Sequence, residues 1–274
     1  MATDTIVLIT GANTGLGLET VKSLLQSSEK KTYTILLGGR SLEKATAAAK
    51  QVKVDFPQSQ SVVTPVQIDI EDDQSIKTLF GNVEKNHGRL DVLVNNAGGQ
   101  FDQQFSSGDL TMRQMWNKSW DVNVTGTYIL TYTLMPLLLK SSDPRLLFIT
   151  SGTSTLAEST NPAVRINHSP TDKGWPKDGG VFAGMGIPAY RASKTGLNMM
   201  MREWVRVLKE DGVKVWCVSP GMLATGLGLG NPELLRQMGA LDPSVGAGVV
   251  RDVVEGRRDE DVGSVVRKEG IQPW

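Results

Sequence analysis

Short apolar runs and longer segments with helical spacing alternate along almost the whole chain. The runs are apolar at consecutive positions, which is typical of parallel strands buried on both faces. Strands are predicted at Thr5–Thr10, Tyr33–Gly38, Val62–Ile68, Leu90–Asn95, Arg145–Thr150 and Val213–Ser219. Such alternation indicates βαβ units with right-handed crossovers and helices on both faces. The pattern therefore predicts an α/β fold built on a doubly wound parallel sheet.

Helices are predicted between these strands. Helical spacing covers residues 18–28, 41–56, 72–88, 125–140 and 190–212. No repeat, low-complexity tract or linker interrupts the alternation, so residues 1–274 are expected to form a single domain. The chain starts without a basic region before its first apolar run, and no apolar stretch approaches the ~20 residues of a membrane span. We expect no membrane association.

Composition narrows the function classes. The 274 residues carry 29 basic and 29 acidic side chains, so nucleic acid is not expected as a partner, because phosphate neutralisation needs a basic surplus. Cys217 is the only cysteine, which excludes an intrachain disulfide and favours a reducing, cytoplasmic setting. With His87 and His168 as the only histidines, neither a zinc site nor a histidine-based catalytic triad is expected, and no metal is predicted.

Glycines gather where the first predicted strand is followed by a helix, and ligands of doubly wound sheets bind beyond such strand ends. The segment reads Thr10-Gly11-x-x-x-Gly15-x-Gly17. In a dinucleotide site Gly11 permits the tight turn, Gly15 lets a pyrophosphate approach, and Gly17 lets helix and strand pack closely. Free amides at a helix N-terminus suit a phosphate. The alternative is a glycine-rich turn without a ligand.

The residues after the second strand bear on cofactor choice. In NAD sites an acidic side chain near this position accepts hydrogen bonds from the adenosine ribose. Here the position is held by Gly39, followed by Arg40 and Ser41. A guanidinium suits a dianionic 2′-phosphate, and Ser41 can cap the next helix. The sequence therefore favours NADPH over NADH, the alternative being an exposed arginine at a helix start.

Polar residues also follow the later strands. Asp69 either contacts an adenine amino group or caps its own loop. Asn95 and Asn96 need paired amides, because unpaired amides are costly at a buried strand end, and Ala97-Gly98 leaves room for a ribose. Hydroxyl side chains gather at 150–155 after the fifth strand.

Tyr190 and Lys194 stand at i and i+4, on one face of a predicted helix. With them, the ordered motifs resemble the short-chain dehydrogenase/reductase family. The resemblance spans nearly the whole chain and rests on Thr10-Gly11-x-x-x-Gly15-x-Gly17, Asn95-Asn96-Ala97-Gly98, Asn123 in N-V-T-G, Ser151, Tyr190-x-x-x-Lys194, and Pro220-Gly221 with Thr225. It implies a Rossmann fold with a nicotinamide cofactor, whose pyrophosphate would lie along the three glycines.

The resemblance also implies a division of chemical roles. Tyr190 would donate a proton to a carbonyl oxygen, and Ser151 would stabilise the charge that develops there. Lys194 would hold the nicotinamide ribose and, with the oxidised nicotinamide, favour the Tyr190 phenolate. Asn123 would organise a water-linked proton relay through Lys194. Ser154 is the alternative to Ser151, because hydroxyls crowd this segment.

A larger set of residues is expected to contact the cofactor. It comprises Gly11, Asn13, Thr14, Gly15, Leu16, Gly17, Arg40, Ser41, Asp69, Ile70, Asn96, Ala97, Gly98, Tyr190, Lys194, Pro220, Gly221 and Thr225. Of these, Thr225 would bind the carboxamide and fix which face of the nicotinamide ring is presented.

Two segments depart from the usual spacing of the family. Ser151 and Tyr190 stand 39 positions apart, and the insertion at about 155–188 is rich in proline and glycine. Carbonyl-reductase-like members also carry a long insertion before the catalytic tyrosine; a solvated loop without a role is the alternative. A substrate lid is predicted at about 222–240. An apolar pocket is predicted from lid residues and from Phe101, Phe105, Trp175, Phe182, Met185 and Ile187; the alternative is that these residues simply belong to the core.

These observations favour an NADPH-dependent reductase of ketones or aldehydes, acting on a bulky apolar small molecule. The alternatives are an NAD-dependent alcohol dehydrogenase running oxidatively and a non-catalytic dinucleotide-binding regulator. The helix at 190–212 carries apolar residues beyond one core-facing stripe. We therefore expect a homo-oligomer, or a monomer if the insertion covers that second face.

Overall fold

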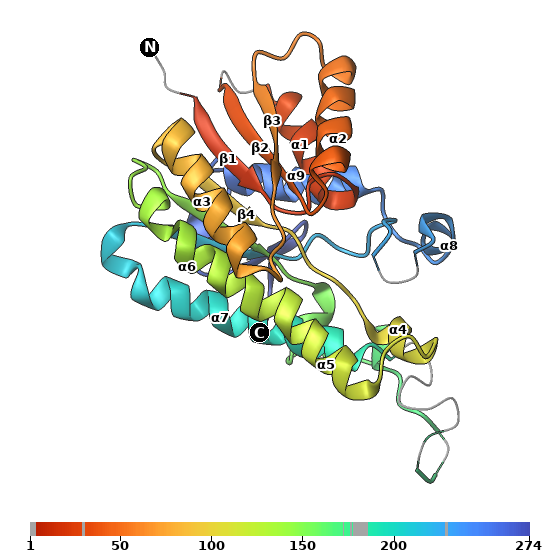
Figure 1. Ribbon diagram of the computed structural model, residues 1–274. Coiled ribbons are helices and arrows are strands. Elements are labelled where there is room, and N and C mark those ends of the chain that lie inside the picture. Colours follow the sequence, from red (N-terminus) through yellow and green to blue (C-terminus); the bar gives the residue numbers. More distant parts are fainter. Residues whose placement is uncertain (1–3, 29–30, 172, 176, 178–185, 228–229) are drawn as a thin grey trace.

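A single twisted sheet forms the centre of the computed structural model, which describes residues 4–28, 31–171, 173–175, 177, 186–227 and 230–274 (Figure 1). Within these residues its eight strands run in the order β3-β2-β1-β4-β5-β6-β7-β8. They are β1 (Thr5–Ile9), β2 (Tyr33–Gly39), β3 (Val62–Gln67), β4 (Val92–Asn95), β5 (Arg145–Ile149), β6 (Lys214–Val218), β7 (Val265–Arg267) and β8 (Gly270–Gln272). All pairs are parallel except β7 with β8.

The predicted doubly wound sheet is confirmed, and all six predicted strands are present. Alternate residues of β1 face opposite cores: Ile6 and Leu8 pack on one side, Val7 and Ile9 on the other. Two layers of helices therefore cover the sheet, and this two-sided burial explains the consecutive apolar residues. The sequence analysis missed β7 and β8, because strands of three residues are too short to show a period.

Helices cover both faces of the sheet. On one face lie α1 (Gly15–Leu25), α2 (Leu42–Asp55) and α9 (Pro243–Val254); on the other lie α3 (Asp73–His87), α6 (Gly126–Leu138) and α7 (Pro188–Val207). The sequence analysis missed α9 and three helices near the strand ends: α4 (Asp102–Ser106), α5 (Met112–Trp120) and α8 (Pro232–Gln237). None of the described helices is long and apolar enough to cross a membrane.

A π-helical turn at Asp121–Thr125 joins α5 to α6 without a break. The helix predicted at 125–140 is therefore only the second half of a longer continuous helix. π-Helical turns are rare and are found frequently at functional sites. This one contains Asn123, which the sequence analysis selected as a candidate catalytic residue.

The strand order places the carboxyl ends of β1 and β4 side by side. Strand β1 pairs with β2 on one side and with β4 on the other, so the chain changes direction across the sheet between them. The glycine segment follows β1, and residues 95–98 follow β4. Ligands of open α/β sheets bind at this kind of switch point.

Candidate active site

The glycine segment forms a tight turn that opens toward a ligand. Gly11 has φ 61°, in the left-handed region that favours glycine. A Cβ at Gly17 would lie 2.6 Å from the Gly11 carbonyl oxygen, so only glycine allows this approach of α1 to the turn. No side chain caps the N-terminus of α1 at Thr14, which leaves its first amides free. Together these features fit a bound pyrophosphate.

Asn96 braces this turn. Its side-chain amide donates to the carbonyls of Thr10 and Gly11 at 2.7 and 3.1 Å. The Thr10 hydroxyl accepts in turn from the amides of Asn96 and Ala97 at 3.1 and 2.9 Å. The predicted role of Asn96 in cofactor binding stays a prediction; its side-chain donors shape the turn itself. Asn95 is buried, and its amide donates to Thr131 at 3.1 Å.

The end of β2 is closely packed at Gly39. A Cβ on Gly39 would lie 3.0 Å from Oδ1 of Asn13 and 3.4 Å from Cβ of Ala45. Arg40 follows with 75% of its side chain exposed, and its guanidinium lies 3.9 Å from the Glu71 carboxylate. Ser41 caps α2 by accepting from the Lys44 amide at 3.2 Å, as the sequence predicted. The arrangement leaves the guanidinium accessible to an anion.

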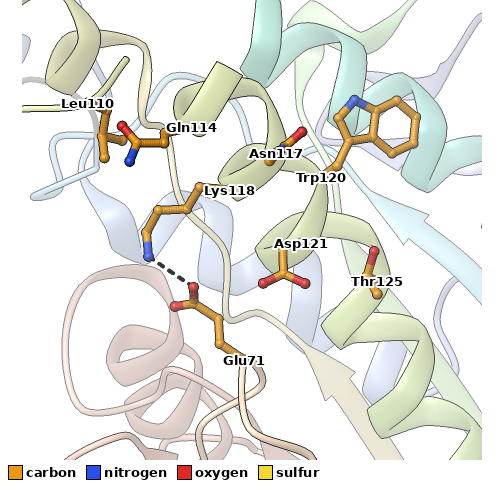
Figure 2. A pocket seen from close by; sticks show the side chains of 8 residues that line it. All are labelled: Glu71, Leu110, Gln114, Asn117, Lys118, Trp120, Asp121 and Thr125. Atoms are coloured by element: carbon orange, nitrogen blue, oxygen red, sulfur yellow. Dashed lines mark hydrogen bonds and ion pairs between the residues drawn. The ribbon is translucent and has the colours of Figure 1, made fainter. Parts of the chain in front are cut away.

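Asp69, Ile70 and Glu71 follow the end of β3. Asp69 accepts from the Glu71 amide at 3.1 Å, which is the loop-capping interpretation of this acid. Ile70 is buried in the core. Glu71 binds Lys118 at 2.9 Å across an open pocket of about 570 Å³, where Figure 2 shows the two side chains pointing toward each other. This pocket lies along α5 and its described lining includes none of the four catalytic candidates.

Asn123 ties the π-helical turn to the loop after β4. Its side-chain oxygen accepts from the Gly99 amide at 2.9 Å, and its nitrogen donates to the Gly99 carbonyl at 2.9 Å and to Ser193 at 3.0 Å. A Cβ on Gly98 would lie 2.9 Å from the Asn123 oxygen and 3.2 Å from the Lys194 ammonium. The absence of a side chain at Gly98 therefore leaves space beside both polar groups.

Lys194 is buried with its ammonium held in place. Nζ donates to the Ile149 carbonyl at 2.8 Å and lies 5.9 Å from the centre of the Tyr190 ring. Burial lowers the pKa of Lys194 to about 8. Its ammonium therefore titrates close to physiological pH.

Ser151 and Ser154 occupy different environments. The Ser154 hydroxyl is buried behind the site, where it donates to the Ser151 carbonyl at 2.6 Å and accepts from Asn198 at 2.9 Å. Gln272 of β8 donates to the same Ser151 carbonyl at 3.2 Å. The Ser151 hydroxyl, by contrast, accepts from the Thr153 amide at 3.2 Å, lies 3.0 Å from the Thr153 hydroxyl, and lowers the pKa of the Tyr190 phenol. The contacts favour Ser151 as the candidate catalytic serine.

Tyr190 is buried in the first turn of α7. Burial raises the pKa of Tyr190 above its ordinary value, and the Asp102 carboxylate raises it further, while the hydrogen bond with Ser151 lowers it without reversing the shift. The sequence analysis expected Lys194 and the cofactor together to favour the phenolate. In the protein alone, burial is the larger effect and the phenol keeps its proton.

The two ends of the segment predicted as a lid lie side by side. Leu223 and Leu241 pair as a parallel bridge, and Thr225 lies across from Gly15, 3.6 Å from the position of a Cβ there. Pro220 and Gly221 lead from β6 into this segment. Among its described residues, Met222, Leu227 and Leu234 have exposed apolar side chains, as does Leu241 just beyond it.

The residues predicted to line an apolar pocket lie in different environments. Trp175 is 77% exposed, and Phe101 packs against Gly99 and below the Lys118 ammonium. Ile187 precedes Pro188 at the N-cap of α7. Phe182 and Met185 lie outside the described residues. The insertion begins against the C-terminus, where Ala157 donates to the Trp274 carbonyl at 2.7 Å.

The structure therefore brings Asn123, Ser151, Tyr190 and Lys194 together beyond the ends of β4 and β5. It also adds residues that the sequence analysis missed. Asp102 accepts from the Tyr190 amide, and Gln272 holds the Ser151 carbonyl. An acid within the otherwise uncharged segment 99–106 was the one signal for Asp102; Gln272 had none.

Comparisons with known proteins show the family to which the chain belongs. A family model described as short chain dehydrogenase matches residues 5–163 and 178–231. The short-chain dehydrogenase/reductase eupG of Phoma sp is 46% identical over 98% of this chain and 97% of its own, and tropE of Talaromyces stipitatus is 44% identical with the same coverage. The NADPH-bound carbonyl reductase from chicken fatty liver has the same fold, with a TM-score of 0.75 and 21% identity over the full length of both chains. The chain is thus an oxidoreductase that belongs to the short-chain dehydrogenase/reductase family, whose members bind NAD(P).

Proposed function

We propose that this protein is an NADPH-dependent reductase that converts the carbonyl of a ketone or aldehyde to an alcohol, on a bulky apolar small molecule. The observation that carries the proposal is the buried Tyr190 phenol, which keeps its proton and interacts with the Ser151 hydroxyl. A protonated phenol beside a second hydroxyl suits proton donation to a carbonyl oxygen. The exposed apolar side chains of the lid support an apolar substrate.

The chain's own residues suggest how the reaction is organised. NADPH, when bound, supplies the hydride. Ser151 donates a hydrogen bond to the carbonyl oxygen, Tyr190 delivers the proton to that oxygen, and Lys194 binds the nicotinamide ribose. Asn123 fixes Gly99 and so holds the loop that carries Gly98 beside the ammonium. The free amides of α1 and the glycine turn hold the pyrophosphate.

The direct test is consumption of NADPH, followed by its absorbance, with a panel of aromatic and aliphatic ketones and aldehydes. Reduction of at least one bulky carbonyl compound is expected. The same panel of alcohols with NAD⁺ is the comparison. Faster turnover in that direction would favour an oxidative dehydrogenase, and no turnover in either direction, with cofactor still bound, would favour a binding protein.

Arg40 should set the preference for NADPH. Replacing Arg40 with alanine should weaken NADPH binding by about one to two decades, because charge-assisted hydrogen bonds contribute about 1.5–3 kcal/mol. NADH lacks the 2′-phosphate, so its affinity should stay near that of the wild type. Fluorescence titration of both cofactors measures the two affinities.

Arg206 provides the matched control, because its guanidinium is similarly exposed and lies at the far end of α7. Arg206→Ala should leave both affinities unchanged. Equal affinities of the wild type for NADH and NADPH would refute the assignment of Arg40.

An exposed apolar patch on α6 and α7 supports a homo-oligomer. Tyr132 and Met199 are 66% and 59% exposed, and Tyr128 and Val207 are also exposed. Tyr128 stacks on Tyr132 and contacts the buried Trp204, with ring centres 6.3 and 5.2 Å apart. Within the described residues, the insertion leaves these side chains exposed. Patches of this kind on soluble proteins mark interaction sites.

We expect a dimer or larger homo-oligomer at micromolar concentration. Light scattering coupled to size exclusion should give at least twice the 29.7 kDa of one chain. Tyr132→Glu should shift the mass toward that of the monomer, because a charge would be buried at the interface. Val54→Glu places the same charge at an exposed apolar residue of α2 and should leave the mass unchanged. A wild-type mass near one chain would contradict the homo-oligomer.

A further inference from the structure

Asp102 is a buried acid that the proposed reaction does not use. Its side chain is 1% exposed, and it is the first residue of the short helix α4. Both carboxylate oxygens are occupied by backbone amides of α7: Oδ1 accepts from Ala189 at 3.0 Å and Oδ2 from Tyr190 at 3.2 Å. Buried acids are rare unless they are paired, so this placement needs an explanation.

The start of α7 explains it. The helix begins at Pro188, which has no amide hydrogen, and Ile187 at the N-cap provides no side-chain acceptor. The first free amides are therefore those of Ala189 and Tyr190, and these are the two that donate hydrogen bonds to Asp102. A carboxylate is also favoured at the positive end of a helix. A residue 87 positions earlier in the chain thus caps the turn that carries the Tyr190 phenol.

The same contact joins two parts of the site. Gly99 is held by Asn123, and Asp102 follows three residues later and is held by α7. The loop after β4 is therefore fastened at both ends, to the π-helical turn and to the helix of Tyr190. A shift of Asp102 would move both the space beside Gly98 and the Tyr190 side chain.

We propose that Asp102 is a positioning residue: by accepting hydrogen bonds from both free amides of the first turn of α7, it fixes the position of the Tyr190 side chain. The proposal rests on the proposed reductase function for its kinetic consequences. Its structural part stands on the two hydrogen bonds and the burial of the side chain.

The charge of Asp102 also affects the ionisation of the Tyr190 phenol. Within the described residues, three groups face the Tyr190 side chain: the Ser151 hydroxyl, the Lys194 ammonium on the same helix, and the Asp102 carboxylate from α4. Arg191, the next residue, turns its guanidinium to the Thr153 carbonyl at 3.1 Å. A negative charge near the phenol disfavours the phenolate, so Asp102 helps Tyr190 to remain the proton donor in alkaline solution.

The test is Asp102→Asn, which keeps the shape of the side chain but replaces one acceptor oxygen with a donor. We expect kcat for carbonyl reduction to fall about tenfold or more, because small displacements of a reacting group are costly. The alkaline limb of the pH profile should move to lower pH, because the phenol loses a neighbouring negative charge. If thermal stability falls but the alkaline limb does not move, the proposal is overturned. That combination is the result expected of a cap with a purely structural role.

Asp72→Asn is the matched control. Asp72 caps α3 with one oxygen, which accepts from the Gln74 amide at 2.9 Å, so asparagine can keep that bond. This variant should have the kcat and the pH profile of the wild type. If Asp102→Asn does not fold, Asp102→Glu replaces it: the retained charge should leave the alkaline limb at its wild-type position even if kcat falls, and a displaced limb would contradict the proposal.

Two measurements without substrate separate this proposal from the proposed function. Hydrogen exchange of residues 186–195 should be faster in Asp102→Asn than in the wild type. Ultraviolet titration, with Tyr190→Phe as the reference in each background, should show Tyr190 ionising at lower pH in Asp102→Asn. If the wild type reduces no carbonyl compound but Asp102→Asn still differs from it in both measurements, the reductase function is refuted and the role of Asp102 is kept. If hydrogen exchange and Tyr190 ionisation are the same in both proteins, only the role of Asp102 is refuted.

Discussion

Replacing Tyr190 with phenylalanine should lower kcat for carbonyl reduction by about 10²–10⁴-fold, the range that a positioned general acid contributes. The ring and its packing remain, and only the phenolic hydroxyl is lost. The hydroxyl is buried and keeps its proton, so its removal takes away the proposed proton donor. NADPH should still bind, because the glycine turn and α1 are unchanged.

Tyr33→Phe is the control for removal of a buried phenol. Tyr33 lies at the start of β2, at the opposite end of the strands, with its hydroxyl 3.3 Å from Glu255. That variant should lose some stability and keep its turnover. Stopped-flow or steady-state kinetics with a reactive aldehyde, together with an NADPH titration, measures both effects. Reduction by Tyr190→Phe at the wild-type rate would rule out the proposed proton donor.

The sheet was predictable because its strands are buried on both faces. Val7 and Leu8 enter different cores, so neighbouring residues of β1 are equally apolar, and the same holds along the other long strands. The glycines were also predictable, since Gly17 has no room for a side chain whatever the ligand. Local constraints of this kind are visible in a single sequence.

Contacts between distant segments were not predictable. Asn96 belongs to a motif that places it at the strand end, but the motif does not show that its amide turns back onto Thr10 and Gly11. Asp102 looks like an ordinary loop acid until the fold brings it to the start of α7. Trp175 was placed near the site because it precedes Tyr190 in sequence, yet it is exposed. Proximity in sequence does not determine how a long proline- and glycine-rich insertion is arranged.

Lys194→Met should weaken NADPH binding by about one to two decades and also lower kcat. The ammonium is proposed to hold the nicotinamide ribose, and hydrogen bonds to charged groups contribute about 1.5–3 kcal/mol. Methionine fills similar volume, but it leaves the Ile149 carbonyl without its donor. Some loss of thermal stability is therefore expected as well. Lys214→Met controls for it, because Lys214 pairs with Asp143 and Asp259 at the start of β6, away from the site.

The pH dependence of NADPH binding tests the role assigned to Lys194 more specifically than the Lys194→Met variant alone. Burial lowers the pKa of Lys194 to about 8, so the ammonium is present below pH 8 and is lost as the pH rises through that value. NADPH affinity of the wild type should therefore decline above about pH 8, where an ordinary lysine, with a pKa of about 10.4, would still be charged. In Lys194→Met this decline should be absent, and in Lys214→Met it should remain. Titration of NADPH from pH 6 to 10 measures the three curves. If Lys194→Met keeps the wild-type decline, another group controls cofactor binding, and the ribose contact assigned to Lys194 is wrong.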